Sequence, residues 1–93
     1  MQLSDALDDY LADCHAKNLS PRTIEWYTQK LNEWAKASPP TLEENTPVKV
    51  RAYLAGLSGL ADNTLHGYTQ VIKVFLNWCE EEKLLPAGTG KRV

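Results

Sequence analysis

The sequence has no long apolar run and no basic N-terminus. None of its apolar stretches approaches the roughly 20 residues of a transmembrane helix. The first residues, MQLSDALDD, are acidic and lack the basic start and apolar stretch of a secretory signal peptide. We therefore expect a cytoplasmic protein with no membrane partner.

Cysteine is scarce. The two cysteines, Cys14 and Cys79, do not make the disulfide framework that supports many small secreted domains. The sequence has neither a CxxC pair nor a cluster of metal ligands, so it predicts no metal site and no cofactor. Because both cysteines fall on apolar stripes with helical spacing, buried free thiols are the simplest interpretation.

An excess of positive charge is also missing, since the chain carries a net charge of −2 and has a sequence pI of about 5.6. Proteins that bind nucleic acids are usually basic, so this total is mild evidence against that class. The charge is unevenly spread, however. Residues 1–19 have a net charge of −3, residues 20–37 have a net charge of +1, and Lys91 and Arg92 follow an acidic cluster at 80–82. A neutral or basic face is therefore compatible with the acidic total.

Strand patterns are absent as well. The 93 residues allow one domain, and an apolar content of 43% excludes disorder. No stretch that alternates between apolar and polar residues is bounded by hairpin turns, whereas apolar residues recur at helical spacing along most of the chain. The sequence therefore predicts an all-α domain over residues 1–85 and a linker with little structure of its own over 86–93. Helices are expected at 4–17, 20–37, from 46 to a turn at 56–62, and at 62–83.

Capping signals mark the expected helix ends. Ser20 followed by Pro21, and Thr46 followed by Pro47, each combine an N-cap hydroxyl with a proline at the first helical position. Ser4 is the expected N-cap of the first helix, and Asn18 is expected to end that helix in a left-handed conformation.

The apolar stripes predict a core in which the fourth helix is central. Trp26 lies off the stripe of its helix, so it either covers the edge of the bundle or contacts a ligand. The predicted core positions are Leu3, Leu7, Tyr10, Leu11 and Cys14; Ile24, Tyr27, Leu31 and Trp34; Val50, Tyr53, Leu54 and Leu57; and Leu65, Tyr68, Val71, Ile72, Val74, Phe75, Leu76, Trp78 and Cys79.

A weak internal repeat relates residues 19–36 to residues 60–77. Two amphipathic helices share an apolar stripe by default, which explains the core positions but explains the shared polar positions less well. The repeat predicts two similar helical hairpins that pack against each other. Five of eighteen aligned positions are identical: Leu19/Leu60, Thr23/Thr64, Tyr27/Tyr68, Thr28/Thr69 and Gln29/Gln70.

The polar faces of the second and fourth helices are candidates for nucleic-acid contact. Thr23 and Thr64 fall in first turns, where unpaired N–H groups and the helix dipole favour phosphate. Asn, Gln, Arg and Lys can read base edges, and Gly67 would let a backbone come close. A plain solvated face explains the same pattern equally well. The outer positions are Arg22, Trp26, Gln29, Lys30 and Glu33 in the second helix and Asn63, His66, Gly67, Gln70, Lys73 and Asn77 in the fourth.

Two segments, LSPRTIEWYTQKLNEW and ADNTLHGYTQVIKVFLNWCEEEKLLPAG, resemble the N-terminal core-binding domain of tyrosine recombinases, the phage-integrase family. Together with the proline-led third helix, the resemblance covers about residues 3–88. In that family the domain is a SAM-like bundle of about four helices. The matching positions are Ser20, Thr23, Tyr27 and Leu31 in the first segment, and Thr64, Ile72, Phe75, Trp78 and the exit 84–86 in the second.

The resemblance implies one half of a C-shaped clamp around double-stranded DNA. A separate catalytic domain beyond the linker would cut and rejoin the strands, so this part of the protein would have no catalytic residues and its tyrosines would not be nucleophiles. The implied protein partners are that catalytic domain and neighbouring recombinase protomers, and no small-molecule substrate is implied. Carried over position by position, the DNA-binding residues are Arg22, Thr23, Trp26, Lys30, Asn63, Thr64, His66, Gln70 and Lys73.

Two departures from the family pattern and two alternative functions remain. Glu25 and Glu33 stand on a helix that is usually more basic, which predicts weak and salt-sensitive DNA binding. The exit has Pro86 where the family usually has Asn-Pro.

A helical protein-interaction module is the second hypothesis, with the acidic first helix and the C-terminal end as its surface. A stand-alone enzyme is disfavoured, because the sequence has no nucleophile–base pair, phosphate loop or metal-ligand spacing.

Overall fold

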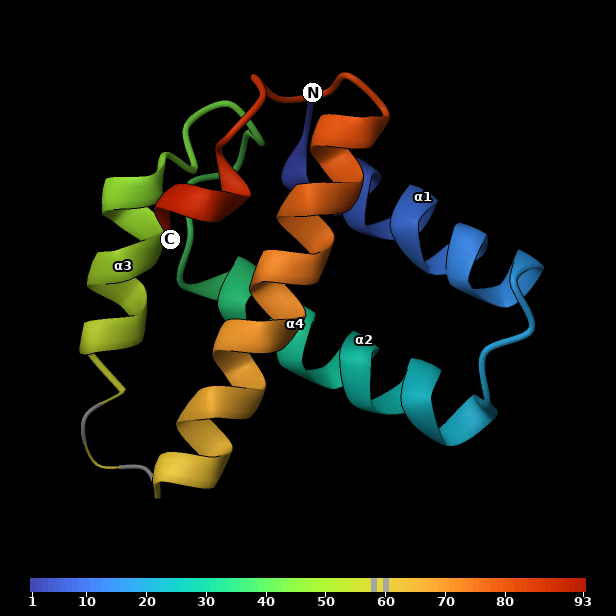
Figure 1. The fold of residues 1–93 in the computed structure, drawn as a ribbon, viewed down its shortest axis with the longest axis horizontal. Coiled ribbons are helices and arrows are strands. Elements are labelled where there is room, and N and C mark those ends of the chain that lie inside the picture. Colours follow the sequence, from blue (N-terminus) through green and yellow to red (C-terminus); the bar gives the residue numbers. More distant parts are fainter. Residues whose placement is uncertain (58, 60) are drawn as a thin grey trace.

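The computed structural model describes residues 1–57, 59 and 61–93, and this part of the chain folds as an all-α bundle (Figure 1). Its only extended pairing among these residues is an isolated bridge between Gln2 and Thr41. The repeat position Leu60 lies outside the described residues, and so does part of the turn predicted at 56–62. The elements are α1 (Leu3–Ala16), α2 (Pro21–Lys36), α3 (Pro47–Ala55), α4 (Asp62–Glu81) and a short 3-10 helix, η1 (Gly90–Arg92).

The long helix α4 contacts α1, α2, α3 and η1, as the sequence predicted for a central helix. The helices α1 and α2 pack against each other as one hairpin, and α3 and α4 form the second (Figure 1). The predicted all-α bundle of two helical hairpins is thus confirmed. The boundary between a domain at 1–85 and a linker stays a prediction.

Two of the predicted N-caps are confirmed by their hydrogen bonds. The Ser20 hydroxyl accepts from the Thr23 amide at 3.2 Å, and the Thr46 hydroxyl accepts from the Lys49 amide at 3.4 Å. Each cap precedes a proline whose missing N–H would have had no partner inside the helix. These local signals work because every interacting group lies within four residues.

The predicted N-cap at Ser4 is wrong, because α1 begins at Leu3 and its N-cap is Gln2, two residues before Ser4. The amide of Leu3 donates to the carbonyl of Pro40 at 2.8 Å, so a distant loop satisfies a first-turn N–H group that a side chain would otherwise have to satisfy. Leu3 is also fully buried, which draws it into the helix and against the core. The helix start is therefore decided by tertiary contacts.

Both α1 and α4 end in the left-handed conformation. Asn18 has φ 58°, as predicted, and the amide of the next residue donates to the carbonyl of Cys14 at 3.3 Å. Lys83 has φ 61° at the corresponding position of α4, with the amide of Leu84 bonded to Cys79 at 2.8 Å. The second of these caps uses a lysine, so the sequence carried no signal for it.

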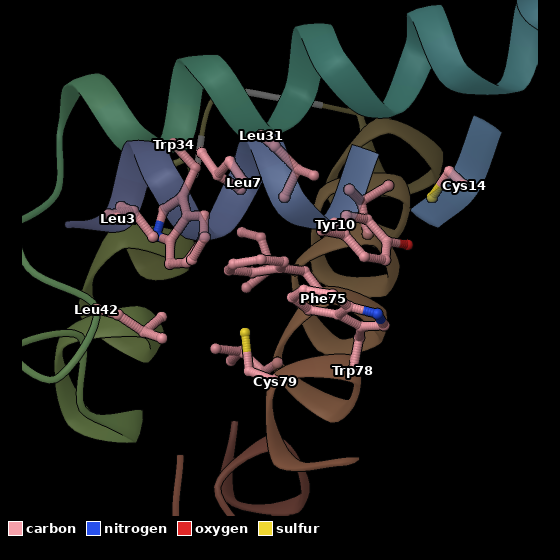
Figure 2. Close-up of a cluster of buried hydrophobic side chains, with 14 of the residues drawn as sticks. Leu3, Leu7, Tyr10, Cys14, Leu31, Trp34, Leu42, Phe75, Trp78 and Cys79 are labelled. Carbon is pink, nitrogen blue, oxygen red and sulfur yellow. The ribbon is translucent and has the colours of Figure 1, made fainter. Parts of the chain in front are cut away.

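The two copies of the internal repeat meet in the core (Figure 2). Trp34 and Phe75 are equivalent in the repeat, both are fully buried, and their rings pack edge to face at 5.8 Å. Thr28 and Thr69 are also equivalent, and each donates to a carbonyl four residues earlier in its helix. These threonines therefore have a structural role. The predicted stripes are buried or half-buried, except for Val74, which is 40% exposed.

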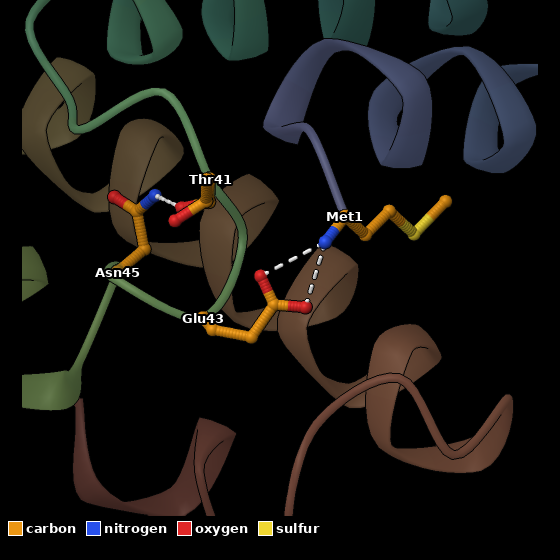
Figure 3. Close-up of polar contacts among 4 residues, drawn as sticks. All are labelled: Met1, Thr41, Glu43 and Asn45. Atoms are coloured by element: carbon orange, nitrogen blue, oxygen red, sulfur yellow. Dashed lines mark hydrogen bonds and ion pairs between the residues drawn. The ribbon is translucent and has the colours of Figure 1, made fainter.

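The loop 38–46 contributes to the core, which its composition did not indicate. Leu42 is completely buried, and the buried Asn45 amide donates to the carbonyls of Pro39 and Thr41 at 3.2 and 2.9 Å. Nearby, the N-terminal ammonium donates to both carboxylate oxygens of Glu43 at 3.0 and 3.1 Å, which lowers the pKa of that carboxyl group (Figure 3). These contacts hold the loop against the start of α1.

The C-terminal segment has more structure than the sequence predicted. The Glu80 carboxylate accepts hydrogen bonds from the amides of Gly88 and Gly90, the latter at 3.0 Å. Thr89 and Gly90 are buried, and Val93 packs against the core. The expectation of little structure over 86–93 is therefore wrong. A carboxylate on α4 organises this segment, and such a contact has no signature in the segment's own composition.

Candidate nucleic-acid interface

One contact between the outer parts of α2 and α4 lies at Trp26 and Gly67. A Cβ atom built on Gly67 would lie 3.0 Å from Cζ2 of Trp26, so the indole rests directly on the glycine backbone. Trp26 is 39% exposed and lies beside Tyr27 at a ring separation of 5.9 Å. Gly67 thus accommodates an internal side chain, which corrects its interpretation as an approach point for a ligand backbone.

A second contact joins the two helices deeper in the bundle. The Lys30 ammonium lies 4.8 Å from the centre of the Tyr68 ring, a cation–π contact, and the Tyr68 hydroxyl donates to the Glu33 carboxylate. This hydrogen bond, together with burial, raises the pKa of Tyr68 to about 12. Burial and the nearby Glu33 charge also raise the pKa of Tyr53 on α3. No local sequence pattern indicates this contact, because Tyr68 and Glu33 are 35 positions apart in the chain.

The predicted contact residues divide into exposed and partly covered groups. Gly67 lies one helical turn from Asn63 and Gln70, so these two residues flank the Trp26 contact on α4. Lys73 lies further round α4. The exposed members of the predicted set are Arg22, Trp26, Asn63, Thr64, His66 and Gln70, and the half-buried members are Thr23, Lys30 and Lys73.

The first turns of α2 and α4 differ in their polar groups. In α2, the Ser20 hydroxyl donates to the Thr23 hydroxyl at 2.8 Å while it accepts from the Thr23 amide. This arrangement engages Thr23 within its own helix. In α4, the N-cap is Ala61, which has no side-chain oxygen, and Thr64 is exposed. Of the two equivalent threonines, Thr64 therefore presents the more accessible hydroxyl.

Acidic groups lie within the same surface. A shallow depression of about 260 Å³ on α2 is lined by Arg22, Glu25, Trp26 and Gln29. The charge of Arg22 is therefore partly offset by Glu25 next to it. The Glu33 carboxylate on α2 accepts a hydrogen bond from the Tyr68 hydroxyl on α4. The surface as a whole is polar and close to neutral.

A separate cleft of about 280 Å³ lies between the end of α1, the start of α2 and the second half of α4. Exposed Leu19 and Val74 line it, together with Tyr10, Asp13 and Trp78. The Trp78 indole donates to the Asp13 carboxylate at 3.2 Å, and burial raises the pKa of Tyr10. This cleft combines apolar walls with an acidic rim, and no residue of the predicted set lines it.

Within the described part of the chain, no three His, Cys, Asp or Glu residues gather in a way that would hold a metal ion. Both cysteines are buried free thiols, as predicted, and burial raises the pKa of Cys79 to about 12. None of the described helices is long and apolar enough to cross a membrane. No protein family, curated protein or solved structure matches the chain.

Proposed function

We propose that this chain is the DNA-binding domain of a site-specific tyrosine recombinase. In this proposal it clamps double-stranded DNA at the core site, and a separate catalytic domain beyond η1 exchanges the strands. The chain itself contributes binding and positioning, with no catalytic residue. The sequence resemblance supplies the enzyme class, and the geometry of α2 and α4 supplies the support for DNA contact.

The observation that carries the proposal is the contact between Trp26 and Gly67. It brings the polar outer faces of α2 and α4 next to each other, so that one duplex can meet both helices. Exposed Asn63 and Gln70 flank this contact on α4, and side chains of these types can bond adenine edges in the major groove. Arg22, on α2, is available to phosphate or guanine.

Electrostatics set the expected strength of binding. Arg22, Lys30 and Lys73 are the cations of this surface, and Lys30 is already engaged with the Tyr68 ring. Two to three phosphate contacts predict a slope of log K against log salt of roughly −2 to −3, which is shallow for a DNA-binding protein. Binding by this domain alone is therefore weak, and the remaining affinity comes from the rest of the enzyme.

Fluorescence anisotropy with a labelled duplex of mixed sequence tests the proposal. Arg22→Ala and Lys73→Ala should each weaken binding and reduce the magnitude of the salt slope by roughly 1. Lys36→Ala is the matched control, because it removes an exposed charge from the last turn of α2, away from the Trp26 contact. Equal effects of all three substitutions would mean that binding depends on net charge alone, and the proposed interface would be wrong.

A helical protein-interaction module is the second candidate function. The cleft between α1, α2 and α4 favours it, because Leu19 and Val74 are large apolar side chains left partly exposed in a concave surface. Under this alternative, Val74→Asp would abolish capture of a partner, whereas Arg22→Ala would have no effect on any binding. The DNA assay above separates the two functions.

A further inference from the structure

The outer stripe of α4 leads directly to η1. Its positions from Asn63 to Asn77 recur at helical spacing along one side of the helix. At its far end, Gly90 is so close to the Asn77 side chain that any Cβ at position 90 would overlap the side-chain oxygen. A ligand that lies along this stripe therefore reaches η1 at the C-terminal end of α4.

Positive charge is concentrated on η1 and α3. Lys91 and Arg92 are exposed on η1, and Lys49 and Arg51 are exposed on α3. These two short elements hold four of the chain's ten basic residues and contain no Asp or Glu. Figure 1 shows η1 beside the first turns of α3, on the other side of α4 from the free end of the α1–α2 hairpin.

A shared cleft joins the two elements. It has a volume of about 190 Å³ and is lined by Pro47 at the start of α3 and by Arg92 of η1, among others. The acidic residue in its wall is Glu43, whose carboxylate is bonded to the N-terminal ammonium. The nearest acidic group of the cleft is thus already paired with a positive charge.

The position of η1 is fixed by Glu80. Its carboxylate accepts from the amides of Gly88 and Gly90, and Gly88 has φ 89°, a conformation that favours glycine. Because Thr89 and Gly90 are also buried, Lys91 and Arg92 project from an ordered turn that is anchored to α4. Ordered cations lose less conformational entropy on binding than cations on a mobile tail.

We propose that α3 and η1 form a second DNA-contact surface, with Arg51, Lys91 and Arg92 bonded to the phosphates of one strand. Arg51 lies one helical turn from Pro47, which lines the shared cleft, whereas Lys49 lines a separate depression beside Ser38 and Pro39. The major groove is about 12 Å wide, and neighbouring helices pack about 8–10 Å apart. With α4 along the groove, α2 meets one flanking strand and α3 with η1 meets the other. The inference rests on the proposed function for its ligand, duplex DNA, and assigns it a new surface.

Paired substitutions in the anisotropy assay test the surface. Lys91→Ala with Arg92→Ala should reduce the magnitude of the salt slope by roughly 2, and Lys49→Ala with Arg51→Ala, which removes the one contact made by Arg51, should reduce it by roughly 1. Through counterion release, one phosphate contact raises the binding constant roughly eightfold at about 0.1 M salt. Loss of each pair should therefore weaken binding by about eightfold or more. Lys17→Ala with Lys36→Ala is the control of equal charge, and thermal melts check that every variant is folded.

The outcomes separate this inference from the proposed function. If the α3 and η1 pairs behave like the control while Arg22→Ala weakens binding, the second surface is wrong and the proposed interface stands. If these pairs alone weaken binding, the second surface stands without the first. If the unsubstituted chain binds no DNA at low salt, both fail. If the pairs abolish only self-association in sedimentation, the surface binds the acidic α1 of a second copy, and the inference is overturned.

Glu80→Ala tests whether η1 must be held in place, which makes Glu80 a positioning residue. Loss of a negative charge alone should strengthen DNA binding, as expected for the control Glu82→Ala at an exposed position. If η1 must be anchored, Glu80→Ala weakens binding instead, and combining it with Lys91→Ala and Arg92→Ala adds no further loss. Tighter binding by both Glu variants would show that anchoring is not needed.

Discussion

Replacing Trp26 with alanine tests the contact on which the proposed interface depends. Trp26 is 39% exposed, so about three-fifths of its surface is covered, and Gly67 and Tyr27 lie beside its indole ring. If a tryptophan buries up to about 250 Å², the covered part is about 150 Å², which at about 25 cal/mol/Å² gives an upper estimate of about 4 kcal/mol. Because the extended-chain reference overstates burial and the exposed edge can relax, we expect a loss of about 2 kcal/mol.

Thermal unfolding followed by circular dichroism measures this loss. For a domain of this size, about 2 kcal/mol corresponds to a fall in Tm of roughly 8–16 °C. Val48→Ala is the control, because Val48 is 66% exposed on α3 and should change stability by no more than about 0.5 kcal/mol. Phe75→Ala, at a fully buried position, should cost more, about 3–5 kcal/mol. A Trp26→Ala protein that melts like the Val48→Ala protein would refute the packing argument.

The glycine beneath the indole provides a second measurement. Alanine at position 67 is favoured over glycine in a helix by about 1 kcal/mol, but its Cβ would lie 3.0 Å from Trp26. Gly67→Ala should therefore raise the free energy of unfolding only slightly in the unsubstituted chain. It should raise it by the full amount when Trp26 is alanine. Equal effects of Gly67→Ala in both backgrounds would mean that the two residues are not coupled.

Three further predictions concern single groups. The pKa of Tyr68 is raised to about 12 from an ordinary value of 10.0, so the unfolded chain loses this proton first. The free energy of unfolding should then fall as pH rises from about 10 to about 12 in urea melts, and Tyr68→Phe should remove that component. Gly90→Ala should destabilise the fold by about 1–3 kcal/mol through overlap with Asn77, and adding Asn77→Ala should restore most of the loss. Cys79 is fully buried with a pKa of about 12, so iodoacetamide should modify it only on unfolding, as mass spectrometry can show; alkylation in the native state would contradict its burial.

Local signals explain what the sequence predicts well about the fold. Ser20 and Thr46 cap their helices through bonds to residues three positions later, and Asn18 adopts its left-handed conformation because of its own side-chain chemistry. The apolar stripes also hold, since helical periodicity alone decides which side of a helix can be buried. Such features require no knowledge of the rest of the chain.

Long-range contacts explain what the sequence does not predict. The start of α1 depends on a carbonyl of Pro40, and η1 depends on the carboxylate of Glu80. In the candidate interface, the outer position of Trp26 follows from helical phase, but its contact with Gly67 requires the crossing of α2 and α4. The hydrogen bond between Tyr68 and Glu33 joins residues 35 positions apart, so no local sequence pattern predicts it.

An NMR amide titration with duplex DNA, at low salt and again at high salt, tests whether α2 and α4 contact DNA. If they do, amide shifts should cluster on the outer faces of α2 and α4, at Arg22 to Lys30 and Asn63 to Lys73, and should fade as salt rises. Shifts confined to α1 and its cleft, or no shifts on α2 and α4 at low salt, would contradict DNA contact by this surface.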